Sequence, residues 1–159
     1  MLKVQSIKMD GKLNEHLKKV SAIRAQARAG FFRNSKYPDG TFVAVVAFQN
    51  ETGANNVPRR PFMHRTLKDN QEKYVKGICA NIKRFGRFDE DSVRSAYETC
   101  AQLMEGDIKR TIMDWLPSDP RFNSPATIAE KRERGVENPE RALVDTGTMV
   151  GKVAHEVII

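Results

Sequence analysis

The chain has 159 residues, 40% of them hydrophobic and 30% charged, so it is long enough to bury one sizeable core and has the composition of a globular domain. Charged residues interrupt every apolar window near the N-terminus, and no uncharged run approaches the length of a membrane span, which argues against a signal peptide, a transmembrane helix and a membrane partner. The net charge of +7 is unevenly placed, with +12 on residues 1–88 and −5 on residues 89–159, and such a basic half attracts nucleic acid or an acidic protein surface.

The N-terminal residues predict an edge strand followed by a surface helix. Residues 2–9 alternate imperfectly between apolar and polar side chains, as in an edge strand that contains a bulge. From residue 12 onward, Leu13, Leu17 and Val20 recur at helical spacing with charged residues between them. This spacing predicts a helix with one face on the core.

The period then changes to that of a strand. Apolar residues at odd positions of residues 23–31 alternate with polar or small ones, which predicts a half-buried strand with a basic outer face. Arg24 and Arg28 lie on that face and Arg33 and Lys36 follow it, so these four residues are candidates for contacts with DNA. The alternative is that these charges are solvated and the nearby phenylalanines anchor the core. We favour the alternative, because no recognised nucleic-acid-binding signature accompanies them.

Residues 41–67 organise the rest of the chain. The small apolar run from Phe42 to Phe48 predicts a short buried helix, which Gly53 can close by taking a left-handed backbone conformation. Residues 58–62, Pro-Arg-Arg-Pro-Phe, predict a stiff extended segment because each proline fixes its own φ and disfavours a helical residue before it. We call residues 58–62 the arm.

Two long helices and several shorter elements are predicted after the arm. The first long helix runs from Pro61 to Gly86, and the second begins at the acidic residues 89–91, extends towards Trp115 and is the longest helix predicted. The remaining elements are a turn-rich excursion at residues 117–125, a short charged helix over 127–134, a helix capped by Asp145 or Thr146, and a final strand over 152–159.

These elements predict one α+β domain that covers residues 1–159. A small antiparallel sheet, built from the strands at residues 2–9, 23–31 and 152–159, packs against a long helix and shorter helices.

The sequence offers few residues for catalysis. His16, His64 and His155 are far apart, and none forms a helical pair with a carboxylate, so we predict no metal site. There is no glycine-rich phosphate loop and no nucleophile elbow. Cys79 and Cys100 are better explained as small buried residues than as a disulfide or as nucleophiles partnered by a histidine. We therefore expect no catalytic residues, no cofactor and no enzymatic activity.

Three groups of motifs follow one another in the order found in a known family. They are Asn50-Glu51-x-Gly53 followed by Pro58-x-Arg60-Pro61-Phe62, then Pro125-Ala126-Thr127-Ile128 with Lys131, then Leu143-Val144-Asp145-Thr146-Gly147 before a closing Glu156-Val157-Ile158-Ile159. In this order, and over most of the chain, the sequence resembles the tail-completion (head–tail joining, or minor tail) proteins of long-tailed double-stranded DNA bacteriophages. Two residues depart from the family's pattern: Thr52 stands where an aromatic residue is usual, and Arg59 where proline or alanine is usual.

The resemblance implies a structural virion protein of a phage or prophage, assembled in the host cytoplasm and located in the neck or at the head-proximal end of the tail. It implies a homo-oligomeric ring, a hexamer, whose partners are other neck and tail proteins and, non-specifically, genomic DNA in the channel. In such a ring one surface of a subunit meets a different surface of its neighbour, and the basic and acidic halves of this chain are complementary in that arrangement. The alternative is a basic nucleic-acid-binding protein.

Nine residues are candidates for the contact between subunits. The two prolines of the arm reduce the cost of ordering it on binding, and the two arginines between them offer planar donors to carboxylates of a neighbour. The alternative is that the phenylalanine of the arm anchors it to its own core while the arginines are solvated. The candidates are Glu51, Pro58, Arg59, Arg60, Pro61, Phe62, Asp145, Thr146 and Gly147.

Overall fold

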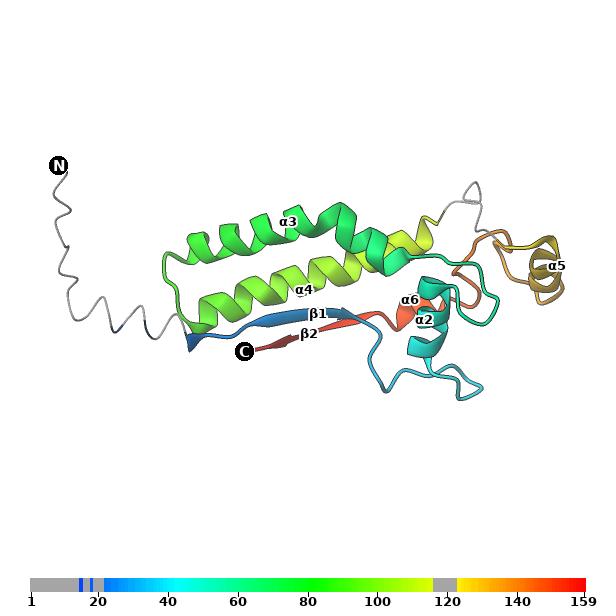
Figure 1. Cartoon of the computed structure of the whole chain (residues 1–159), viewed down its shortest axis with the longest axis horizontal. Helices are drawn as coiled ribbons and strands as arrows, with labels where there is room; N and C mark the ends of the chain where they lie inside the picture. Colours follow the sequence, from blue (N-terminus) through cyan, green and yellow to red (C-terminus); the bar gives the residue numbers. More distant parts are fainter. Residues whose placement is uncertain (1–14, 16–17, 19–21, 116–122) are drawn as a thin grey trace, which may run out of the picture.

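A computed structural model describes residues 15, 18, 22–115 and 123–159 of the chain (Figure 1). Within these residues the fold is α+β, as predicted, with five helices and a two-stranded antiparallel sheet. The elements are β1 (Gln26–Gly30), α2 (Val43–Thr52), α3 (Phe62–Phe85), α4 (Glu90–Met113), α5 (Pro125–Glu133), α6 (Thr148–Gly151) and β2 (Ala154–Ile158). The strand predicted at residues 2–9, most of the helix predicted from residue 12, and most of the turn-rich segment 117–125 lie outside the described residues.

The long helices α3 and α4 lie side by side and antiparallel, on the same side of the sheet (Figure 1). Gly86 ends α3 in the left-handed conformation (φ 65°), and Asp89 begins α4 in a capping box, its carboxylate accepting a hydrogen bond from the Ser92 amide at 2.9 Å. Both boundaries confirm the predictions. The prediction that the second helix is the longest is wrong: both helices span 24 residues, because nothing interrupts α3 before its closing glycine.

A buried carboxylate on α4 accepts hydrogen bonds from two side chains of α3. The Asp107 side chain, only 6% exposed, accepts hydrogen bonds from Lys73 Nζ at 2.6 Å and from the Tyr74 hydroxyl at 3.0 Å. Burial and this hydrogen bond raise the pKa of Tyr74, so its hydroxyl stays protonated and keeps donating to Asp107.

The strand predicted over residues 23–31 is present as β1 but is shorter than predicted, because only residues 26–30 pair with β2, and the alternation is confirmed. Exposed side chains at residues 24, 26 and 28 alternate with half-buried ones at 23, 25, 27 and 29. β1 pairs with β2 in an antiparallel register that runs from Gln26 opposite Ile158 to Gly30 opposite Ala154. The chain's final strand is therefore confirmed too, and both strands contact α4.

His155 ties β2 to α4. Its Nδ1 lies 2.5 Å from Glu105 Oε2, and its Nε2 lies 3.0 Å from Glu98 Oε1. These hydrogen bonds, the one to Glu105 first, raise the pKa of His155 above its ordinary value of 6.5. The imidazolium is therefore favoured in the folded chain, where it bridges two carboxylates of one helix.

This bridge predicts how stability depends on pH. Because the folded pKa of His155 is raised, its contribution is fully present below the unfolded pKa, near 6.5, and is lost as the pH rises through the folded pKa. We expect the free energy of unfolding to decrease over that window in the wild type, and His155→Gln to remove this decrease. Urea titrations at several pH values between 5.5 and 8.5 measure both.

His64→Gln, at an exposed histidine that takes no part in the bridge, is the matched control. Glu105, whose pKa is lowered by hydrogen bonds to Lys109 and His155, acts outside this window, because its contribution is lost only as the pH falls below the ordinary value of 4.5. Parallel pH profiles for the wild type and His155→Gln would contradict the bridge.

The hydrophobic core gathers where α2, α3, α4 and α6 meet (Figure 1). Its buried members are Val43, Ala47, Phe62, Ile108, Ile112, Trp115, Ala142, Met149 and Val153. The predicted helix after Phe42 is confirmed as α2, and Gly53 closes it with φ 80°, but the prediction that this helix is buried is only half right. α2 buries Val43 and Ala47, because its apolar residues lie all round the helix and a single layer of neighbours covers one side.

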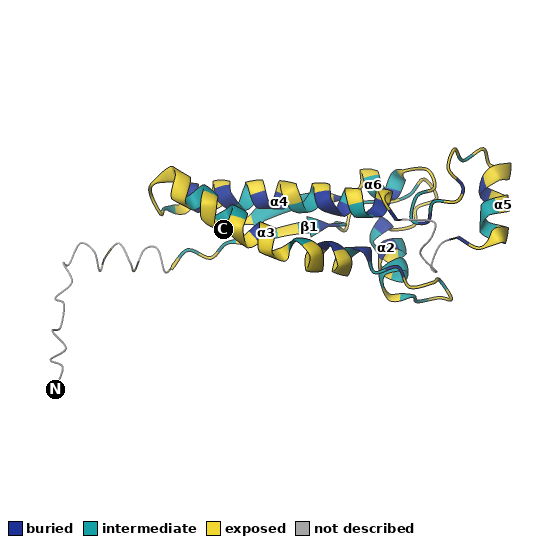
Figure 2. Cartoon of the chain, turned by 90° about the horizontal axis from the view of Figure 1, so that it is seen from above, coloured by how far each residue is buried: buried dark blue, intermediate teal, exposed yellow. Residues whose placement is uncertain are grey.

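The C-terminal part packs as a loop and two short helices, of which α5 is mostly exposed (Figure 2). The predicted charged helix is α5, which begins two residues earlier than expected because Ser124 caps it and Pro125 suits its first position. The prediction that Asp145 caps α6 is wrong, because the Asp145 carboxylate forms an ion pair with Arg134 at 2.8 Å. Gly147 is the N-cap residue, and the Thr146 hydroxyl lies 3.4 Å from the Thr148 amide.

The two cysteines differ in exposure. Both are free, and Cys100 is buried as predicted, but Cys79 is exposed. Cys79 is exposed because Tyr74 and Ile78 take the covered side of α3. Among the described residues, no helix is both long and apolar enough to cross a membrane.

Candidate subunit interface

The first group of motif residues forms a joint between α2 and α3. Glu51, at the end of α2, accepts hydrogen bonds from the Met63 amide at 2.8 Å (Oε2) and from the His64 amide at 3.0 Å (Oε1). These amides belong to the first turn of α3, where the helix dipole favours a negative charge. The Glu51 carboxylate therefore acts within its own chain, as a remote cap on α3.

Asn50 and Arg60 close the same joint. The Arg60 amide donates to the Asn50 carbonyl at 2.6 Å, and its guanidinium Nη1 donates to Asn50 Oδ1 at 2.9 Å. Gly53 lets the arm return this closely: a Cβ atom there would lie 2.9 Å from the Cβ of Arg59. The joint, residues 50–64, thus holds the arm against the end of α2.

The two arginines of the arm differ in their exposure to solvent. Arg60 is only 7% exposed and Phe62 is fully buried, whereas Pro58 and Arg59 are exposed and Pro61 is half-buried. For Phe62 this is the alternative stated above, in which it anchors the arm to its own core. The guanidinium of Arg60 is neither solvated nor presented to a neighbour, so Pro58 and Arg59 remain the accessible residues of the arm.

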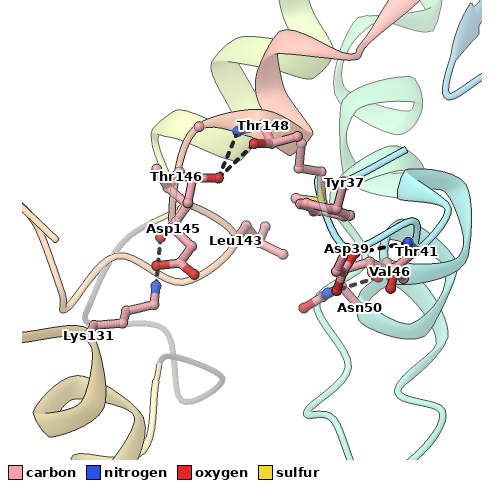
Figure 3. A pocket seen from close by; sticks show the side chains of 13 residues that line it. Tyr37, Asp39, Thr41, Val46, Asn50, Lys131, Leu143, Asp145, Thr146 and Thr148 are labelled. Atoms are coloured by element: carbon pink, nitrogen blue, oxygen red, sulfur yellow. Dashed lines mark hydrogen bonds between the residues drawn. The ribbon is translucent and has the colours of Figure 1, made fainter. Parts of the chain in front are cut away.

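The last three interface candidates line a pocket of about 320 Å³ that has both polar and apolar side chains (Figure 3). Asp145 and Lys131 approach it from one side, and Tyr37, Asp39 and Asn50 from the other (Figure 3). Burial first, and then the nearby carboxylates of Asp145 and Asp39, raise the pKa of Tyr37. Asp145, Thr146 and Gly147 are exposed, so a neighbour can reach this rim.

Lys131 holds the rim of the pocket in place. Its side chain is buried, and its Nζ donates to the carbonyl oxygens of Arg141 at 2.9 Å and Val144 at 2.6 Å. Burial lowers the pKa of Lys131, the expected direction for an ammonium removed from water. The motif lysine thus positions the loop that presents residues 145–147.

The described residues offer little support for catalysis. No group of three or more histidine, cysteine, aspartate or glutamate side chains among them can hold a metal ion. Burial raises the pKa of the Cys100 thiol, which disfavours the reactive thiolate.

Three apolar hollows, which the sequence did not predict, lie along α3 between the α3–α4 turn and α2. The middle hollow, of about 330 Å³, is lined mainly by Ala29, Met63, Leu67, Tyr74, Met104 and Ile108. A separate hollow of about 130 Å³ lies nearer the α3–α4 turn, lined by Ile23, Ala25, Ile78, Ile82, Phe88, Val93 and Tyr97. A third, of about 220 Å³, continues the middle hollow towards α2 and is lined by Phe31, Ala44, Ala47, Phe48, Glu51 and Met63. We call these three hollows together the apolar groove.

Exposed apolar side chains border the groove. Leu67 of α3 and Phe48 of α2 line the hollows and are 52% and 61% exposed. Val75, which is 61% exposed, precedes the lining residue Ile78 by three positions on α3 and so lies beside it on the helix. Phe42 and Val45, also exposed, extend this surface on α2. A contiguous apolar surface of this kind on one subunit marks a site of contact with another protein. The sequence signal for the groove was the alanine at alternate positions of the predicted strand, because these small side chains leave space beside β1.

The four basic candidates for DNA contacts lie just before β1, on it and in the loop that follows it. Arg24 and Arg28 share its exposed face, where Arg28 Nη1 lies 3.3 Å from Glu156 Oε1 on β2. Arg33 is exposed in the following loop, and Lys36 Nζ lies 4.6 Å from the centre of the Phe42 ring. Glu156 partly offsets the charge of this face, so the four residues do not form an unopposed basic patch.

No family model, curated protein or solved structure matches this chain.

Proposed function

We propose that this protein is a structural subunit of the neck or head-proximal tail end of a long-tailed double-stranded DNA phage, or of a related prophage. Copies of it form a ring that completes the tail and joins it to the head connector, in contact with other neck and tail proteins. The ordered motifs of the sequence supply the family resemblance. The observation that carries the proposal is the exposed apolar surface formed by α2 and the groove, because a single subunit leaves it uncovered.

Assembly accounts for more of the surface than nucleic-acid binding does. A nucleic-acid-binding face presents clustered cations with few carboxylates, whereas Arg28 is paired with Glu156 and the groove is apolar. Genomic DNA in the channel remains a non-specific partner in this proposal. The alternative function, a basic nucleic-acid-binding protein, predicts binding that is tight at physiological salt and selective for sequence.

Charging the α2 surface tests the proposal. We expect the wild-type protein to have several times the monomer mass in light scattering, and Phe48→Asp to reduce it to a monomer, because a carboxylate at a buried apolar contact is strongly unfavourable. The melting temperature of Phe48→Asp should stay close to that of the wild type, since Phe48 is 61% exposed in the subunit.

Leu103→Asp is the matched control. Leu103 is an exposed apolar residue of α4 that lines none of the three hollows, so this variant should keep the wild-type mass. A wild-type monomer that binds one DNA sequence tightly, with affinity that falls steeply as salt is added, would replace the structural proposal with the alternative.

A further inference from the structure

We propose that the apolar groove of each subunit is filled by residues 12–22 of a neighbouring copy of the same chain. This inference rests on the proposed function, because it requires a ring of identical subunits. It assigns the groove an occupant of known sequence and makes the N-terminal segment the link between neighbours.

The segment has the chemistry that the groove requires. Leu13, Leu17 and Val20 recur at four- and three-residue spacing and so share one face of the predicted helix, with charged or polar residues between them. The described residues within this segment, Glu15 and Lys18, are helical and exposed, as expected for its polar side. An amphipathic helix whose apolar face lies in a hydrophobic groove is a common mode of recognition.

The helix is long enough to cover two of the three hollows of the groove. Residues 23–31, which follow the groove on the β1 side, span about 26 Å at 3.3 Å per residue. A helix over residues 12–22 spans about 16 Å at 1.5 Å per residue, enough to cover the middle hollow and one of its neighbours. Leu67 and Val75, the exposed residues of the α3 border, would then be covered by the helix.

The connection to β1 favours a neighbour over the subunit's own segment. Ala22 is still helical and β1 begins at Gln26, so only residues 23–25 connect the helix to the strand. Ile23 and Ala25 also line the end of the groove nearest the α3–α4 turn. These three residues, two of which line the groove, leave little chain to turn the helix back over its own groove, whereas a second copy can enter from outside.

Cross-linking between differently tagged copies tests this arrangement. In a Cys79→Ser background, which retains the buried Cys100, Leu17→Cys is introduced in one copy and Val75→Cys in the other, and the two are co-expressed. We expect a short bismaleimide to produce a covalent pair that carries both tags. Pairing Leu17→Cys with Gln102→Cys, at an exposed residue of α4 that lines none of the hollows, should give several-fold less of that product.

Light scattering of the same samples separates the two proposals. A ring that yields no Leu17–Val75 product between copies, or a chain carrying both cysteines that cross-links only to itself, overturns the inference and leaves the ring intact. A monomeric wild-type protein overturns the proposed function itself.

Discussion

Phe62→Ala is expected to lower the free energy of unfolding by about 3–5 kcal/mol. Phe62 is fully buried as the first residue of α3, and its ring packs edge-on against Phe31 at a centroid distance of 6.1 Å. Its neighbours in the core come from α2, α4 and α6, so removal of the ring leaves a cavity between several elements. Equilibrium urea unfolding followed by circular dichroism measures the loss.

Phe48→Ala provides the control for this substitution. It removes the same side chain from α2, at a position 61% exposed in the subunit, and should change the stability of an isolated subunit by less than about 1 kcal/mol. Similar losses in the two variants would show that Phe62 is not the anchor of the arm.

Arg60→Glu is expected to destabilise the subunit and Arg59→Glu is not, although the two residues are adjacent and have the same side chain. Arg60→Glu should lower stability by about 2 kcal/mol or more, because it removes the buried donor to Asn50 and places a carboxylate beside that residue's amide oxygen. Arg59→Glu should leave the melting temperature almost unchanged, because Arg59 is exposed and its contact with the Glu51 carbonyl is long, at 3.4 Å.

The two variants also separate folding from assembly. If the arm contacts a neighbour in the proposed ring, Arg59→Glu should give a folded subunit that completes few tails in a phage complementation assay. Thermal unfolding and the yield of infectious particles are measured on the same variants. A normal particle yield with Arg59→Glu would remove the arm from the interface, and a normal melting temperature with Arg60→Glu would contradict the closure of the joint.

Most element boundaries could be predicted from the amino-acid sequence, because the signals for them are local. Gly53 and Gly86 end helices through a left-handed conformation that other residues rarely take, and Asp89 begins α4 through a carboxylate that reaches an amide three residues away. The alternation in residues 23–31 likewise depends only on the period of a strand, and it predicted β1 and its exposed face.

Which of several equivalent residues is buried depends on contacts with distant parts of the chain. Arg59 and Arg60 have the same side chain, yet Asn50, ten residues earlier in the chain, determines that Arg60 is the buried one. Cys79 and Cys100 both fit helical apolar patterns, but α3 turns Cys79 outward. Glu51 caps a helix that begins eleven residues later, a pairing that no local pattern indicates.

The apolar groove depends on tertiary structure for the same reason. Its lining residues come from β1, α3 and α4, and each contributes an apolar side chain that is ordinary in its own segment. They form a hollow only because the alanines of β1 face α3 across a space that their small side chains do not fill. Local sequence determines where helices and strands begin and end. Which face of each helix or strand is buried depends on residues from distant parts of the chain that pack against it.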